Sequence, residues 1–232
     1  MSEKERLENI GWSRRTEGFE IVLGRYIMKK TLELAKGPRV LDVGCGDGSL
    51  TKILAENFDN VVGVDGSREK IRLAKETVLG VEFHESLFED FETRDRFDSI
   101  MMINLLEHVE DPILCVEKAR NLLKPEGRVI VFVPNALSLN RRIGKLMGII
   151  ESYYELTSND LNLGHRRSYD MNILIKDLEK GGLTVNRRGG VFLKPLSNKQ
   201  MESWNGKICD ALYEIAEELP DYSSTIYARG VY

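Results

Sequence analysis

The stretch that decides the fold of this chain is RVLDVGCGDGSL, residues 39–50. It opens with a short apolar run rich in Val and Leu, which is too short for a helix and typical of a buried strand in a parallel sheet. A Gly-x-Gly-x-Gly turn and a run with helical spacing follow, the order in which doubly wound folds build a nucleotide-type site. Gly44 and Gly46 can adopt positive φ and carry no Cβ, so a ligand can approach the backbone closely. A tight turn without a ligand is the alternative that the glycines alone leave open.

The residues around this turn select the kind of ligand. The run NVVGVD, residues 60–65, reads as the next strand and places Asp65 about 20 residues after the glycines, where a carboxylate accepts hydrogen bonds from ribose hydroxyls. Ser49 replaces the third glycine of the dinucleotide fingerprint, and no phosphate-binding loop motif is present. Asp42 and Asp47 flank the turn, where they would repel a pyrophosphate and attract an ammonium group. These features favour a nucleoside with a cationic end, and S-adenosylmethionine fits that description.

Four segments resemble motifs of the class I S-adenosylmethionine-dependent methyltransferases, in the family's order. VLDVGCGDG (40–48) resembles the first motif and VDGS (64–67) the second, while FDSIMMINLLEHV (97–109) and LLKPEGRVIVFVPN (122–135) resemble the segments of the fourth and fifth strands. The resemblance implies a doubly wound, Rossmann-like α/β fold with a seven-stranded, mostly parallel sheet and helices on both faces. It also implies an antiparallel last strand inserted between the fifth and sixth. It implies S-adenosylmethionine as the cofactor and says little about the methyl acceptor.

The resemblance also assigns residues to the cofactor. Asp65 takes the place of the acid that binds the ribose hydroxyls, and the glycine turn faces the rest of the cofactor. In many relatives an Asp just after the third strand meets the adenine amino group; Ser86 stands there in this chain, so the adenine contact stays open. The expected cofactor-binding residues are Asp42, Gly44, Cys45, Gly46, Asp65, Gly66, Ser67, Ser86, Leu87, Asn104 and Leu105.

Length and composition fit one α/β domain over residues 1–232. The chain has 42% hydrophobic and 30% charged residues and a formal net charge of −4, which disfavours an extended nucleic-acid surface. No apolar run is long enough to span a membrane, and the first residues lack the apolar region of a signal peptide. The three cysteines form no C-x-x-C pair and the three histidines show no metal-ligand spacing. We therefore expect a cytoplasmic protein without a metal site, whose oligomeric state the sequence leaves open.

Two long helices are expected outside the motif region. Residues 17–36 carry apolar side chains at helical spacing and should cover one face of the sheet or lid the cofactor. Residues 199–219 are expected to form a single helix with one apolar face. Ahead of the first helix, Arg14 and Arg15 either reach the carboxylate of the cofactor or form a solvated pair.

Residues 136–169 follow the fifth strand and are expected to form a lid over the acceptor, because doubly wound folds bind ligands at the carboxyl ends of their strands. His165 either takes the proton of the acceptor, orients the acceptor or lies on the surface. His108 is either catalytic or structural. Arg166 and Arg167 either face solvent or bind an anionic acceptor, such as a phosphate or carboxylate. The expected catalytic residues are His165 and His108, and the expected acceptor-binding residues are Asn135, Tyr153, Tyr154, Arg166, Arg167 and Tyr169.

The leading interpretation is a methyltransferase that acts on an oxygen or nitrogen atom of a small molecule, with an anionic acceptor as one option. Residues 106–109 and 134–135 resemble quinone-biosynthesis O-methyltransferases and sugar or natural-product methyltransferases. A macromolecular methyltransferase, acting on protein or RNA, is the second interpretation. Residues 103–106 lack the [D/N]-P-P-[Y/F] motif associated with adenine or glutamine amide methylation. A non-catalytic, cofactor-binding partner subunit is the third.

Overall fold

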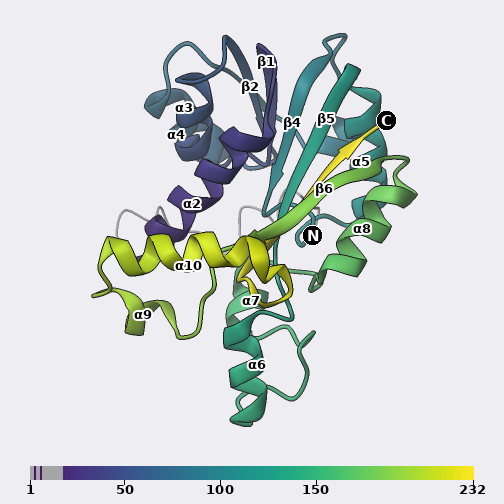
Figure 1. Cartoon of the computed structure of the whole chain (residues 1–232). Coiled ribbons are helices and arrows are strands. Elements are labelled where there is room, and N and C mark those ends of the chain that lie inside the picture. Colours follow the sequence, from purple (N-terminus) through teal and green to yellow (C-terminus); the bar gives the residue numbers. More distant parts are fainter. Residues whose placement is uncertain (1–2, 4–5, 7–17) are drawn as a thin grey trace.

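Seven strands form one twisted sheet in the computed structural model, which describes residues 3, 6 and 18–232 (Figure 1). The strands are β1 Arg39–Val43, β2 Asn60–Asp65, β3 Glu82–Glu85, β4 Phe97–Ile103, β5 Leu123–Pro134, β6 Thr184–Val191 and β7 Thr225–Val231. Their order is β3-β2-β1-β4-β5-β7-β6, in which β1 to β5 pair in parallel and β7 runs antiparallel to both neighbours. The predicted doubly wound, Rossmann-like topology with an inserted last strand is confirmed.

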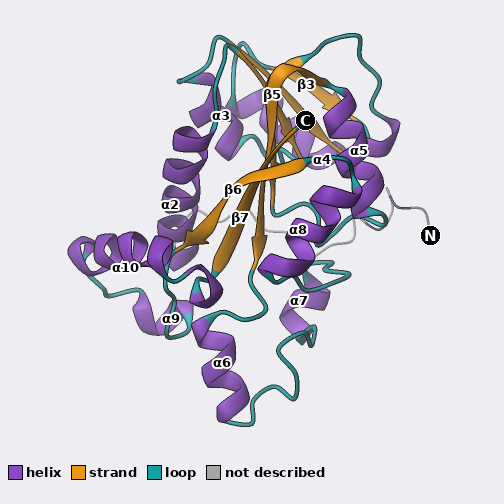
Figure 2. Ribbon diagram, turned by 45° about the vertical axis from the view of Figure 1, so that its right-hand side comes forward, coloured by secondary structure: helices purple, strands orange, loops and turns teal. Residues whose placement is uncertain are grey.

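Helices cover both faces of this sheet because consecutive strand residues point to opposite sides. In β4, Ile100 and Met102 pack with residues of α5 and α8, whereas Met101 and Ile103 pack with residues of α2, α3 and α10. Figure 2 shows these helices on the two sides of the sheet. The helices are α2 Phe19–Leu34, α3 Ser49–Ala55, α4 Arg68–Thr77, α5 Pro112–Asn121, α6 Leu139–Leu146, α7 Ser158–Asn162, α8 Met171–Lys180, α9 Asn198–Met201 and α10 Gly206–Glu218, with short 3₁₀ turns at Phe88–Asp90 and Pro220–Tyr222.

The expected helix over residues 199–219 is wrong in one respect, since the segment forms two helices, α9 and α10. Asn205 lies between them, and its side chain accepts a hydrogen bond from the Ile208 N–H, which caps a new helix there. The break also changes the buried face: Cys209 and Tyr213 point into the core, whereas Ile208 is 44% exposed. Helix α2 starts and ends within the expected residues 17–36.

Residues 136–169 leave the sheet at the carboxyl end of β5, and α6 and α7 project beyond that edge (Figures 1 and 2). The two ends of the segment meet, because the Ala136 N–H donates to the Tyr169 carbonyl at 2.7 Å. Thr157 and Asp160 form a reciprocal capping box at the start of α7. Within the described part of the chain, none of the helices has the length and apolar character needed to cross a membrane.

Candidate functional site

The glycine turn after β1 is held against β2 by its backbone. The N–H groups of Gly44 and Cys45 both donate to the Val64 carbonyl, at 2.8 and 3.1 Å. Gly44, Gly46 and Gly48 adopt positive φ values of 76°, 56° and 79°, a region that glycine enters without steric cost. A Cβ built on Gly46 would meet no atom within 4 Å, so the backbone there borders open space.

Asp65, at the end of β2, organises this edge of the sheet. One carboxylate oxygen accepts from the Gly46 N–H at 3.0 Å and the other from the Ser67 N–H at 2.9 Å. Its carbonyl accepts from the Ser86 N–H at 3.0 Å, which brings the end of β3 to the same place. Because a carboxylate oxygen has two lone pairs, each oxygen can still accept one more hydrogen bond.

The other expected cofactor residues near β2 and β3 have local partners. Ser67 is the N-cap of α4 and accepts from the Lys70 N–H at 3.4 Å, with Gly66 preceding it in the turn. The Ser86 hydroxyl donates to the Leu87 carbonyl at 2.8 Å. These contacts shape the turns next to Asp65 and leave mainly backbone groups facing a ligand.

Asp42 and Cys45 are turned into the protein. Asp42 is buried, and its carboxylate accepts a hydrogen bond from the Thr51 hydroxyl at 2.6 Å. Burial, helped by the charge of Asp65, raises the pKa of Asp42 to about 6. The Cys45 thiol packs against Phe83 in a small apolar cluster. The Asp42 carboxylate therefore ties β1 to α3. This buried placement does not match the expectation that Asp42 pairs with the ammonium group of a ligand.

Asn104 and Leu105 bring the end of β4 to the glycine turn. A Cβ on Gly44 would lie only 3.0 Å from Leu105 Cδ1. Asn104 is exposed and has φ 51°, a conformation that is uncommon outside glycine and is often retained at ligand sites. The expected cofactor residues thus gather along the carboxyl ends of β1, β2, β3 and β4.

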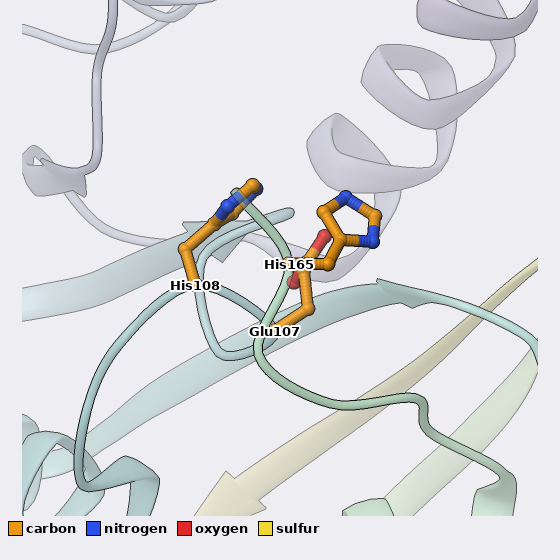
Figure 3. Close-up of side chains that lie close together, drawn as sticks. All are labelled: Glu107, His108 and His165. Carbon is orange, nitrogen blue, oxygen red and sulfur yellow. The ribbon is translucent and has the colours of Figure 1, made fainter. Parts of the chain in front are cut away.

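Beyond β4, a second group of polar side chains converges from two distant segments (Figure 3). The ligand atoms of Glu107, His108 and His165 all lie within 4.8 Å of one another. The two imidazole rings meet edge to face with their centroids 4.8 Å apart. Glu107 and His165 also line a cavity of about 30 Å³ between the end of β5 and residues 160–169. The predicted pair of histidines is thus brought together, with a carboxyl group that the sequence analysis did not include.

Burial keeps this cluster uncharged near neutral pH. Burial raises the pKa of Glu107 to about 8, which favours the protonated carboxyl. Burial and the neighbouring His165 lower the pKa of His108 to about 4, and burial also lowers the pKa of His165. Such a trio is spaced closely enough for a metal ion, although the guanidinium groups of Arg166 and Arg167 lie beside it and disfavour a further cation.

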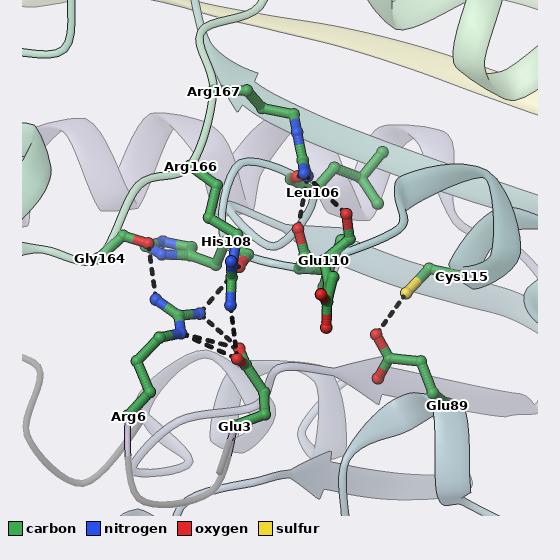
Figure 4. A network of polar contacts seen from close by, with 11 residues as sticks. Glu3, Arg6, Glu89, Leu106, His108, Glu110, Cys115, Gly164, Arg166 and Arg167 are labelled. Carbon is green, nitrogen blue, oxygen red and sulfur yellow. Dashed lines mark hydrogen bonds and ion pairs between the residues drawn. The ribbon is translucent and has the colours of Figure 1, made fainter. Parts of the chain in front are cut away.

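Arginine side chains hold the loop that carries Glu107 and His108 (Figure 4). The Arg167 guanidinium donates to the carbonyls of residues 106, 109 and 110, at 2.6 to 2.9 Å. Arg166 donates to the His108 carbonyl through its side chain and to the Glu107 carbonyl through its backbone N–H. Arg6 adds bonds to the carbonyls of residues 108 and 164. The expectation that Arg166 and Arg167 bind an anionic acceptor is not matched, because backbone carbonyls occupy them.

The other expected acceptor residues point elsewhere. The Asn135 amide is buried and bonds to the carbonyls of residues 221 and 223 and the N–H of residue 137. The hydroxyl of Tyr169 donates to Asp177, and that of Tyr154 donates to Asp170. The ring of Tyr153 packs against the side chains at positions 142 and 145. The polar groups of Asn135, Tyr154 and Tyr169 thus bond to neighbouring parts of the chain, and Arg14 and Arg15 lie outside the described residues.

Comparisons with known proteins agree with this geometry. A family model described as a methyltransferase domain matches residues 19–187, well over half of the chain. The chain belongs to this methyltransferase family. It is 30% identical over 169 residues to a ubiquinone biosynthesis O-methyltransferase of Aeromonas salmonicida, covering 70% of each chain. It is 34% identical to the Actinobacillus pleuropneumoniae enzyme of that name, over 54% of this chain and 55% of the relative.

Solved methyltransferase structures share the fold of this methyltransferase. A Mesorhizobium loti S-adenosylmethionine-dependent methyltransferase superposes with a TM-score of 0.66 at 18% identity, over 92% of this chain and 99% of the other. The Bradyrhizobium japonicum N-methyltransferase NodS, in complex with S-adenosyl-L-homocysteine, gives a TM-score of 0.62 at 16% identity, over 99% and 98% of the two chains.

The cofactor of the methyltransferase is S-adenosylmethionine, and the residues at the carboxyl edge fit it. Asp65 keeps two lone pairs for ribose hydroxyls, and the backbone at Gly46 borders open space that a side chain would fill. Sequence reasoning missed Glu107, the carboxyl group of the second cluster. Its signal was an acid directly before His108 and directly after the apolar pair Leu105-Leu106.

Proposed function

We propose that this protein methylates a hydroxyl oxygen of a small molecule. Bound S-adenosylmethionine supplies a methyl group that its sulfonium already activates, so the protein has to align the acceptor and receive its proton. The observation that carries the proposal is the cluster of Glu107, His108 and His165, whose uncharged polar groups lie beside a small cavity. A hydroxyl group matches such a cluster, because it donates one hydrogen bond and accepts others. The O-methyltransferase names of the relatives support the same acceptor atom.

The acceptor is proposed to be uncharged at the reacting end. The guanidinium groups of Arg166 and Arg167 are engaged with carbonyl oxygens, which removes the main reason to expect a phosphate or carboxylate. The buried carboxyl of Glu107 would also repel an anion whenever it ionises. An anionic group elsewhere on the acceptor is compatible with this arrangement.

His165 is proposed to orient the acceptor from the lid formed by residues 136–169. Its side chain is 12% exposed, and its Nδ1 lies 3.8 Å from a carboxylate oxygen of Asp160, which keeps the ring turned toward the cluster. The cysteines at positions 45, 115 and 209 are free and buried, which supports a reducing, cytoplasmic setting. The net charge of −4 supports a small molecule over nucleic acid as the acceptor.

The test is an acceptor screen with methyl-labelled S-adenosylmethionine. Purified protein is incubated with phenols, alcohols, carboxylates and primary amines, and mass spectrometry locates the label. We expect labelled methyl ethers. A screen in which only amines or carboxylates become labelled would contradict the proposal. Asp59→Ala, at an exposed position far along the chain from the second cluster, serves as the matched control for acid substitutions.

A further inference from the structure

The carboxyl group of Glu107 is a buried acid without a partner. The residue is 1% exposed, and neither carboxyl oxygen has a hydrogen-bond partner within the described part of the chain. Buried polar atoms are nearly always paired, because an unpaired one loses its hydrogen bonds to water and gains none in return. Glu107 also lines the cavity beside His165, so a group bound in that cavity can reach it. The unpaired oxygens therefore point to a ligand contact.

The two histidines are less suited to accept a proton than this carboxyl group. His108 hydrogen-bonds to the Gly164 carbonyl, and its buried Nδ1 has no hydrogen-bond partner among residues 3, 6 and 18–232. Because burial lowers the pKa of His108 to about 4, its imidazole holds a proton only weakly near neutral pH. Burial raises the pKa of Glu107 to about 8, so its carboxylate holds a proton firmly, and the gain of that proton removes a buried charge.

We propose that Glu107 is the general base that removes the proton from the acceptor hydroxyl, a role that rests on the O-methyltransferase function proposed above. The acceptor O–H bond breaks and its proton goes to a carboxylate oxygen of Glu107. The acceptor oxygen bonds to the methyl carbon, and the bond from that carbon to sulfur breaks with its electron pair left on sulfur. The carboxyl then returns the proton to solvent after product leaves. His165 holds the acceptor in place, and the unpaired Nδ1 of His108 can accept a hydrogen bond from it.

Charged and titratable groups lie around Glu107, and together with burial they determine the pH at which its carboxyl group ionises. The positive charge of Arg167 favours the carboxylate, whereas burial favours the neutral acid and outweighs it. Since a general base works in its deprotonated form, the reaction should accelerate as pH rises through about 8. The groups that face the cluster or its cavity are His108, Arg141, Asp160, His165, Arg167 and Tyr169.

The experiment compares the wild type with Glu107→Gln, Glu107→Asp and Glu117→Gln, using the hydroxyl compound that the wild type methylates fastest in the screen. The turnover number kcat and the affinity for S-adenosylmethionine are measured from pH 6.5 to 9. We expect Glu107→Gln to lower kcat by about 10²- to 10⁴-fold and to lose the rise near pH 8. Glu107→Asp should keep the rise at a reduced rate. Glu117→Gln, the matched control at an exposed position on α5, should keep both the rise and kcat.

A second readout does not depend on turnover. Calorimetry should give unchanged S-adenosylmethionine affinity in all three variants, because the glycine turn and Asp65 lie at a different part of the edge. The pH dependence of unfolding should flatten in Glu107→Gln, which shows that this carboxyl titrates in the folded protein.

Several outcomes would overturn the proposal. A Glu107→Gln variant that keeps both kcat and the rise near pH 8 would exclude Glu107 as the base. Loss of wild-type activity with EDTA, restored by Mg²⁺, would assign the cluster to a cation and also exclude this role. A wild type that methylates only amines would overturn the proposed function and this role together, whereas the first two outcomes leave hydroxyl methylation intact.

Discussion

The cofactor edge, at the carboxyl ends of β1 to β4, and the proposed acceptor cluster, formed by Glu107, His108 and His165, are built in different ways. At the cofactor edge, the geometry comes mainly from the backbone of two short turns. Gly44 and Gly46 adopt positive φ, and the Asp65 carboxylate accepts hydrogen bonds from N–H groups of both turns. In the proposed acceptor cluster, side chains from positions 107–108 and 165 meet where Arg166 and Arg167 hold the loop that carries Glu107 and His108. A site made from local backbone geometry leaves a readable pattern in the sequence, whereas one made from long-range side-chain contacts does not.

The largest expected effect is at the cofactor edge, in Gly46→Val. The variant should show no measurable cofactor binding, because a branched side chain would fill the open space and the backbone has φ 56°. Gly80→Val is the matched control, since Gly80 also has positive φ and open space around it but lies in the loop before β3. Thermal stabilisation by S-adenosylmethionine is the measurement. A wild-type shift in Gly46→Val would contradict the assignment of the turn.

Asp65→Ala should have the next largest effect. The ribose hydroxyls lose a charged acceptor worth about 1.5–3 kcal/mol, so affinity for S-adenosylmethionine should fall at least about tenfold. The variant also frees the N–H groups of Gly46 and Ser67, so circular dichroism must confirm an intact fold. Asp59→Ala, at an exposed position, is the control. An unchanged dissociation constant, measured by calorimetry, would rule out Asp65 as the ribose ligand.

These two variants concern residues that the sequence already identified. The glycine turn and Asp65 were predictable because each belongs to a short motif whose geometry is local, whereas the order of the strands was implied by the resemblance to the methyltransferase family. The break between α9 and α10 was not predicted, because the apolar spacing of residues 199–219 hides the Asn205 cap. Glu107 was missed because only the folded structure shows that its carboxyl is buried and, among the described residues, has no hydrogen-bond partner. The carbonyl partners of Arg166 and Arg167 were not predicted, because they lie about 60 positions earlier in the chain and sequence patterns are local.

The acceptor cluster should make stability depend on pH. The folded-state pKa of Glu107 is about 8, above its ordinary value of 4.5, so its contribution is present below 4.5 and is lost as pH rises to 8. The folded-state pKa of His108 is about 4, below 6.5, so its contribution is present above 6.5 and is lost as pH falls to 4. The two slopes oppose each other between 4.5 and 6.5, and only Glu107 acts between 6.5 and 8.

Across that upper window, the free energy of unfolding should fall by about 1.4 kcal/mol per pH unit, or about 2 kcal/mol in total. Urea unfolding of the wild type and Glu107→Gln at pH 6.5, 7.25 and 8 measures the slope. The slope should flatten in Glu107→Gln and persist in Asp59→Ala. Equal slopes in wild type and Glu107→Gln would mean that Glu107 ionises in the folded protein as it does in the unfolded chain.

The smallest expected effect concerns the arginine that fixes the acceptor loop. Arg167→Lys replaces a planar group that bonds to the carbonyls of residues 106, 109 and 110 with an ammonium that cannot span all three. The loop stays attached through Arg166, so the loss is one or two hydrogen bonds, about 1 kcal/mol, and kcat should fall about fivefold. The affinity for S-adenosylmethionine should stay constant, because the cofactor edge makes no use of Arg167. Arg188→Lys, at an exposed position on β6, is the matched control. A fall in cofactor affinity that equals the fall in kcat would mean that the two sites are mechanically coupled, and the contrast between them would then have to be abandoned.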